Sequence, residues 1–147
     1  MYKIYKLILI LILINLPVSS KAHVQHYDNL NRIEFDIYRN NKHIGKHIFS
    51  FDRSGEKLSV KSEINFVIKK LGIVFYKYHV KGEEIYKDGK LVKFNSKTNQ
   101  NGKEKFVNII LEENDLIIDG SSYKGKVSSD FIIGTWWNHS IVKAKAQ

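Results

Sequence analysis

Residues 58–68, with the sequence LSVKSEINFVI, alternate apolar and polar side chains more regularly than any other part of this 147-residue chain. Apolar residues fall at every second position, interrupted only by Ser62, and most of the residues between them are polar or charged. A period of two is that of a β-strand, whose successive side chains point to opposite faces of a sheet. The segment therefore predicts a long strand with one apolar and one solvated face.

The same period continues on both sides of this segment. Upstream, Ile33, Phe35 and Ile37 share one face, and the return segment 44–51 changes parity near Gly45, which predicts a β-bulge there. Downstream, alternation predicts further strands, namely Val74 to Val80 continuing on the even positions to Tyr86, Val92 to Thr98, Phe106 to Leu111, and Leu116 to Ile118.

Turn motifs separate these predicted strands. Asn40-Asn41, Asp88-Gly89 and Asn101-Gly102 suit the left-handed positions of hairpin turns, and further turns are expected at residues 53–56, 70–72 and 113–115. After the first 22 residues no segment has the apolar spacing of an amphipathic helix. We therefore predict an all-β fold, an antiparallel meander of about seven long strands that curls into an open barrel or half-barrel to cover its own apolar face.

The first 22 residues have the pattern of a signal-peptide helix. Lys3 and Lys6 precede the apolar run 7–14, and small residues at Ser20 and Ala22 suit cleavage after Ala22, with cleavage after Ser20 as the alternative. The apolar stretch is too short for a membrane-spanning helix. We expect a signal peptide at 1–22, a polar lead at 23–31, one β domain at 32–147, and a periplasmic or secreted protein with no membrane span after cleavage.

Composition narrows the class further. The chain contains no cysteine, so we expect neither disulfides nor a lipid-modified cysteine. Its net charge is +9, and removal of residues 1–22 would leave 21 basic against 15 acidic residues, a net charge of +6. Because the lysines are dispersed and alternate with acids, we expect no nucleic-acid binding, and at most weak attraction to anionic envelope surfaces.

The six histidines do not form a convincing metal site. His43 and His47 lie four residues apart on one predicted strand, or about 13 Å. His23 would become the N-terminus after cleavage, and its amine and ring with His26 could hold copper, although a solvated tail is the simpler interpretation. We expect no metal and no cofactor.

Glu84 is the one acid on a predicted aromatic row. Burying an ionised carboxylate without a partner costs several kcal/mol, so Glu84 must pair, lie at a rim or have a raised pKa. It could act as an acid or base or as a polar contact for a ligand; alternatively it pairs with a Tyr hydroxyl or a Lys, or a bulge at Gly82 turns it outward. The chain has no catalytic motif, and of Trp136 and Trp137 at most one is expected to pack inward.

From Phe35 to Asn138 the chain resembles a family of secreted bacterial proteins known only as domain of unknown function 6134. The resemblance rests on residues 36–38 (DIY), Ile44-Gly45, 76–78 (YKY), 84–86 (EIY), 88–91 (DGKL), 98–102 (TNQNG) and Trp137-Asn138. It implies an exported, β-rich, envelope-facing protein without known activity, and it assigns no catalytic residue. Where the family commonly has Trp this chain has Tyr86, and relatives continue with further strands past the Trp-Asn pair, which implies a shortened chain with an unpaired edge.

Three functional hypotheses follow. The first is a periplasmic binding or accessory module for a small apolar or amphipathic ligand, and the second is a structural or protein-interaction component of the envelope that pairs through an edge strand. The third is an enzyme centred on Glu84 with Tyr76 and Tyr78. The predicted ligand-binding residues are Phe35, Phe49, Phe66, Tyr76, Tyr78, Glu84, Tyr86 and Phe94.

Overall fold

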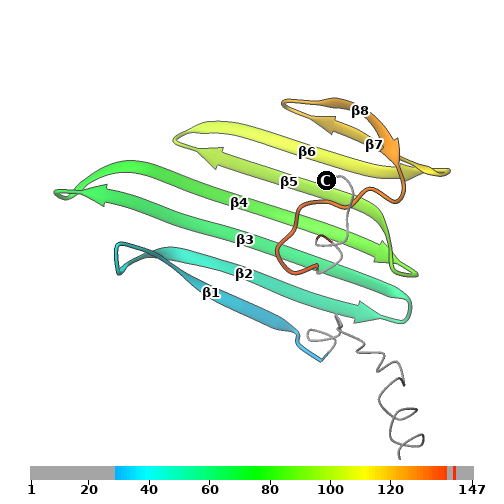
Figure 1. The fold of residues 1–147 in the computed structure, drawn as a ribbon, viewed down its shortest axis with the longest axis horizontal. Coiled ribbons are helices and arrows are strands. Elements are labelled where there is room, and N and C mark those ends of the chain that lie inside the picture. Colours follow the sequence, from blue (N-terminus) through cyan, green and yellow to red (C-terminus); the bar gives the residue numbers. More distant parts are fainter. Residues whose placement is uncertain (1–28, 139–140, 142–147) are drawn as a thin grey trace, which may run out of the picture.

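The chain folds as a single antiparallel meander (Figure 1). The computed structural model describes residues 29–138 and residue 141, so the predicted signal peptide and His23 and His26 lie outside the described residues. Each strand pairs with the next in sequence, in the order β1 to β8. The strands are β1 (Arg32–Arg39), β2 (Lys42–Ser54), β3 (Lys57–Lys70), β4 (Ile73–Lys87), β5 (Lys90–Gln100), β6 (Lys103–Glu112), β7 (Asp115–Gly120) and β8 (Lys124–Ser128).

The predicted all-β meander is confirmed, with one strand more than expected. β8 was not predicted, since its sequence KGKVS contains a single apolar side chain, Val127, and shows no alternation. The sheet is open, because β1 and β8 each have one neighbouring strand in the described structure. It therefore bends without closing into a barrel.

The turns lie where the sequence predicts them. Asn40, Asn41, Asp88 and Asn101 all have positive φ, as hairpin turns of two residues require. These residue types tolerate the left-handed conformation better than other non-glycine residues. Turn chemistry thus sets where each long strand ends.

Gly45 marks a bulge, as its change of parity predicted. Ile37 pairs with Gly45 while Tyr38 pairs with His43, so Ile44 is the extra residue of β2. A Cβ at Gly45 would lie 2.0 Å from the backbone oxygen of Asn65. Only glycine permits this close approach of β2 to β3.

Two further register shifts correct the predicted strand faces. Between β3 and β4, Ile68 pairs with Tyr76 and Lys69 with Val74, so Val74 does not share the face of Tyr76. Between β4 and β5, Ile85 pairs with Lys93 and Tyr86 with Leu91, so Leu91 is buried in the place predicted for Val92. A bulge shifts parity by one residue, which a strict period of two cannot anticipate.

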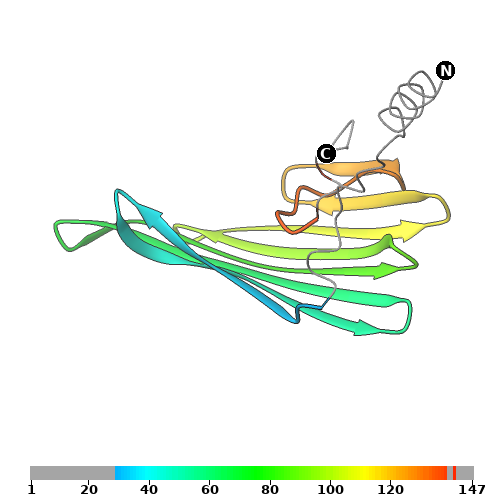
Figure 2. The same ribbon diagram turned by 60° about the horizontal axis from the view of Figure 1, so that its bottom comes forward.

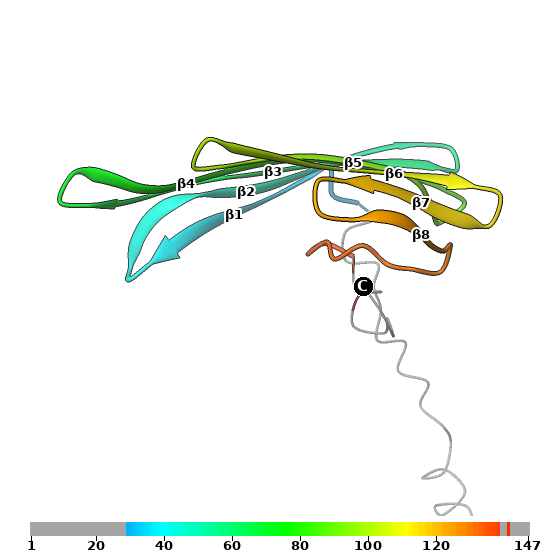
Figure 3. The same ribbon diagram turned by 90° about the horizontal axis from the view of Figure 1, so that it is seen from above.

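The sheet bends toward one side, and we call that side the concave face. Figure 3 shows β1–β2 and β7–β8 curving toward the side on which residues 129–138 lie. This non-strand segment crosses the concave face over one end of the strands (Figures 1 and 2). The buried core lies between the segment and the sheet, and its apolar members are Phe49, Phe51, Val60, Tyr86, Leu91, Ile109, Leu116 and Ile133.

The opposite end of the concave face has no such cover in the described structure. It lies near the turns at 40–41, 71–72 and 101–102 (Figures 1 and 2). We call the two regions the covered end and the open end. In the described residues no helix is long and apolar enough to cross a membrane.

Candidate functional site

All eight predicted ligand-binding residues lie on the concave face, but they fall into two groups. Residues paired across neighbouring strands point to the same face of the sheet. The pairs that begin at Phe35 and Phe49 on β1 and β2 extend this face across β3 to β4 and β5. Glu84, Tyr86 and Phe94 belong to the covered end. The open end holds Phe35, Phe66, Tyr76 and Tyr78, with Phe49 between the two groups.

Glu84 lies in the core of the covered end and is 1% exposed. The Tyr86 hydroxyl donates a hydrogen bond of 2.6 Å to its Oε2. The indole Nε1 of Trp137 donates to both carboxyl oxygens, at 3.0 Å and 3.1 Å. The Thr135 hydroxyl lies near the carboxyl without reaching hydrogen-bond geometry. The donors to Glu84 are Tyr86 and Trp137.

The surroundings of Glu84 favour its protonated form more strongly than water does. Burial raises its pKa, and the contacts with Tyr86, Trp137 and Thr135 offset part of that rise because they favour the carboxylate. Burial, followed by the nearby Glu84 charge, also raises the pKa of the Tyr86 hydroxyl. The carboxyl is therefore held by neutral donors in a low-dielectric setting.

This arrangement anchors residues 129–138 to the sheet. Trp137 also packs edge-on against Phe51 and Tyr86, with ring centroids 5.5 Å and 5.7 Å apart. Trp136 is 83% exposed, so the prediction that at most one of the two tryptophans packs inward is confirmed. Strand periodicity did not reveal the contact between Glu84 and Trp137, because Trp137 lies on the distant segment.

The enzyme hypothesis joined residues that the fold separates. Tyr78 lies six residues from Glu84 on β4, about 20 Å along an extended strand, and Tyr76 lies farther away. The buried carboxyl is closed off beneath Trp137 in this structure. Glu84, Tyr76 and Tyr78 therefore do not form one catalytic group here.

At the open end three aromatic side chains form a continuous surface, which we call the aromatic shelf: Phe66, Tyr76 and Tyr78. The rings of Tyr76 and Tyr78 are stacked with centroids 6.2 Å apart, and Phe66 lies 5.8 Å and 5.3 Å from them. All three side chains are partly exposed. Nearby Phe35 is 50% exposed and lies 6.4 Å from His47, whose pKa is lowered by burial.

A small hollow of about 220 Å³ lies on the concave face over β5, β6 and β7, and none of the three shelf residues is in its lining. Its floor includes Ser96, Thr98 and Lys105, and the loop after β7 contributes Ser121 and Ser122. Cross-strand pairing places Thr98 beside Val80, one row from Tyr78, and Lys105 beside Thr98. We call this hollow the hydroxyl pocket; sequence alternation alone did not predict it, because residues 121–123 close it from outside the strands.

A larger hollow, of about 960 Å³, lies on the opposite face, and none of the eight predicted residues is in its lining. Its lining contains charged side chains of both signs. Glu63 in this wall pairs with His79 at 2.7 Å and with Lys81 at 3.7 Å, and these partners lower its pKa. Because charges of both signs alternate, the wall does not favour a ligand of one charge.

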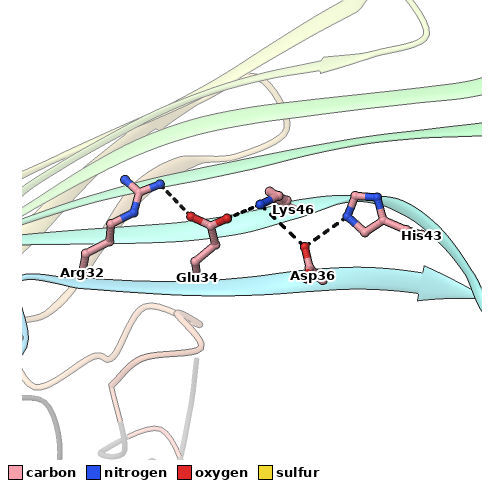
Figure 4. Close-up of polar contacts among 5 residues, drawn as sticks. All are labelled: Arg32, Glu34, Asp36, His43 and Lys46. Atoms are coloured by element: carbon pink, nitrogen blue, oxygen red, sulfur yellow. Dashed lines mark hydrogen bonds and ion pairs between the residues drawn. The ribbon is translucent and has the colours of Figure 1, made fainter.

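The same polar face carries a row of ion pairs between β1 and β2 (Figure 4). Glu34 pairs with Arg32 at 2.8 Å and with Lys46, and Lys46 reaches Asp36 at 3.8 Å. His43 completes the row, 3.1 Å from Asp36. Lys46 and Arg32 lower the pKa of Glu34, and the row is exposed, so it is a solvated strand face.

The histidines are dispersed in the structure. The bulge at Ile44 places His43 against Asp36 on the polar face, whereas His47 lies on the concave face beside Phe49. No group of three or more potential metal ligands occurs among the residues the structure describes.

The protein is an all-β protein with one open antiparallel sheet, and residues 129–138 are anchored over one end of its concave face. The family model named Domain of unknown function (DUF6134) matches residues 35–147. The chain therefore belongs to this uncharacterised domain family. No curated protein and no solved structure matches the chain.

Proposed function

We propose that the protein is an exported binding module whose open end binds a small amphipathic molecule with an anionic group. The observation that carries this proposal is the aromatic shelf, which is stacked and partly exposed. A small hollow with serine, threonine and lysine side chains in its lining begins one row away on β5. An apolar surface with a few placed polar groups is the usual composition of a small-molecule site.

The shelf supplies the apolar half of the site. An apolar group that covers the exposed aromatic rings removes apolar surface from water. This burial contributes about 25 cal/mol of binding free energy per Å² of buried apolar surface. The stacked rings of Tyr76 and Tyr78 already share one orientation, so a flat or linear hydrocarbon can lie across both. Little reorganisation is needed for binding.

The hydroxyl pocket supplies the polar half. Ser96 and Thr98 offer hydroxyl groups, and Lys105 in the same lining offers a positive charge. Lys103 lies across from Gln100 in the row that contains Tyr78. Two lysines beside a shelf of aromatic rings favour a carboxylate, sulfonate or phosphate group on the ligand.

The test uses two probes with the same aromatic body. Anilinonaphthalene sulfonate carries a negative charge, and its parent phenylnaphthylamine is uncharged. Both should fluoresce on binding, and Tyr78→Ala should weaken each about tenfold by removing part of the shelf. Lys105→Ala should weaken the sulfonate by about threefold to tenfold and leave the uncharged probe unchanged.

Ile110→Ala is the matched control, because Ile110 is an exposed apolar residue that pairs with Lys93 on the polar face. It should alter neither affinity. If the wild-type protein binds neither probe, or if Tyr78→Ala and Ile110→Ala behave alike, the proposed site is wrong. Native mass spectrometry of the protein purified from its own cells then identifies the natural ligand.

Export is part of the proposal. Its support is the basic, apolar and small-residue pattern of residues 1–22. We expect the protein from fractionated cells to be found outside the cytoplasm with His23 at its N-terminus, as intact mass will report. An unprocessed N-terminus in the cytoplasmic fraction would contradict export.

A second candidate function is pairing with an envelope protein through β1. Within the described residues β1 pairs with β2 alone, so its other edge offers backbone groups to an added strand. Replacing the edge residue Ile37 by proline should abolish capture of such a partner. A monodisperse monomer that captures nothing from periplasmic extract would count against this candidate.

A further inference from the structure

The hairpin that joins β3 to β4 ends in an apolar tip. Leu71, Ile73 and Phe75 are 94%, 65% and 63% exposed, and Val74 is exposed as well. Figure 1 shows this hairpin extending beyond the neighbouring ones. Scattered apolar side chains on a surface are ordinary, whereas a contiguous group at a protruding tip indicates a contact surface.

Leu71, in the turn of this hairpin, is an unusual residue for its backbone conformation. Leu71 has φ 51° and precedes Gly72 with φ 80°. Three other hairpin turns place Asn40, Asp88 or Asn101 at the equivalent position, and these residues accept positive φ readily. The turn between β6 and β7 has Glu113 there, which is also polar. Backbone geometry therefore favours a small polar residue at position 71, and an exposed Leu there requires another reason.

The tip is also basic. Lys69 and Lys70 precede it and Lys77 follows it, and no Asp or Glu occurs between residues 64 and 82. Tyr76 and Tyr78 follow directly behind the tip on the aromatic shelf. Apolar residues at the outermost point, lysines around them and tyrosines behind form the order found at the surface of a bilayer.

We propose that this tip, residues 69–77, inserts into the surface of an anionic lipid bilayer. Leu71, Ile73 and Phe75 enter the boundary of the acyl chains, while the lysines contact lipid phosphate groups. The inference goes beyond the proposed function, since it requires neither a ligand on the shelf nor the hydroxyl pocket.

A bilayer fits this tip better than a groove on a folded partner. Residues 73–75 are all exposed. Ile73 pairs with Lys70 and Val74 with Lys69, so Ile73 and Val74 point to opposite faces, and Phe75 is the bulged residue beside them. The apolar surface therefore surrounds the hairpin. A fluid medium can cover both faces of the tip at once, whereas a groove contacts one of them.

Co-sedimentation with vesicles tests the inference on the protein as it is recovered from expressing cells. We expect binding to an equimolar mixture of phosphatidylcholine and phosphatidylglycerol and little binding to phosphatidylcholine alone. Leu71→Asn should weaken binding about tenfold, because it removes the outermost apolar side chain while suiting the turn. Lys69→Ser with Lys70→Ser should weaken it about 10- to 30-fold.

Two controls keep the test specific. Lys57→Ser with Lys90→Ser makes the same change of charge at the opposite end of the sheet and should leave binding unchanged. Phe75→Trp adds a reporter in the tip to the native Trp136 and Trp137. Its emission, taken as the difference from the wild-type spectrum, should shift to the blue on anionic vesicles.

The outcomes are distinct from those of the probe experiment. Loss of vesicle binding in Leu71→Asn together with unchanged probe affinity supports the membrane contact on its own. If the wild-type protein does not bind anionic vesicles, or if Leu71→Asn and Lys57→Ser with Lys90→Ser bind alike, the inference is overturned. An unshifted Phe75→Trp emission in vesicle-bound protein overturns it too.

Discussion

The covered and open ends of the concave face are built by the same strands and the same alternation, yet they have different surroundings. At the covered end Tyr86 lies under Trp137 and is buried, whereas at the open end Tyr78, on the same strand and face, is partly exposed. The difference comes from residues 129–138, which cover one end alone in the described structure. An aromatic row on a sheet thus becomes core or binding surface according to what the chain lays over it.

The largest effect is expected where the cover is anchored. Trp137→Ala removes two aromatic contacts and both indole hydrogen bonds to Glu84. It should lower the free energy of unfolding by about 3–5 kcal/mol, measured by urea denaturation. Trp136→Ala, its exposed neighbour, should change that free energy by no more than about 0.5 kcal/mol. Equal losses in the two variants would show that the anchor is not at Trp137.

A second pair of variants compares one residue type at the two ends. Tyr86→Ala should lower the free energy of unfolding by about 3 kcal/mol because it opens a cavity beside Glu84. Tyr78→Ala should lower it by about 1 kcal/mol, since solvent already reaches that side chain. Thermal unfolding followed by circular dichroism measures both, and similar losses would contradict the division into a covered and an open end.

The pH dependence of stability tests the carboxyl at the covered end. Burial raises the pKa of Glu84, so the folded state binds the proton more tightly than the unfolded chain does. The stabilising contribution of Glu84 is therefore complete below its unfolded pKa and is lost as pH rises through its folded pKa. Glu84→Gln keeps the size of the side chain, an acceptor for Trp137 and a partner for Tyr86, but it does not titrate.

We expect the unfolding free energy of the wild type, measured relative to Glu84→Gln, to fall as pH rises above the unfolded pKa of Glu84. Urea denaturation at each pH provides the comparison, and the groups shared by both proteins cancel. A difference that stays constant or grows with pH would contradict a raised pKa.

The smallest effect is a gain at the open end. Leu71→Asn replaces a bulky residue at φ 51° by one that accepts this conformation. It should raise the free energy of unfolding by about 0.5–1 kcal/mol, detected as a higher midpoint of thermal unfolding. Ile73→Asn, at a position without positive φ, is the control and should give no gain.

Alternation and turn chemistry predicted most of the strand ladder, the bulge near Gly45 and the shared face of the aromatic residues, because these features depend on residues close in sequence. The same reasoning missed β8, whose five residues carry one apolar side chain. It also missed two register shifts, one that buries Leu91 in the place predicted for Val92 and one that puts Val74 on the face opposite to Tyr76. Bulges depend on how two strands fit together, so the pattern of one strand does not reveal them.

The candidate site divides in the same way. Local pattern sufficed to place Glu84 and the aromatic residues on one face and to show that a carboxyl there needs a partner, since strand parity is a property of neighbouring residues. That Trp137, 53 residues away, reaches Glu84 was decided by tertiary packing. The same packing buries one end of the row and leaves Phe66, Tyr76 and Tyr78 accessible, because coverage depends on where a distant, non-periodic segment lies.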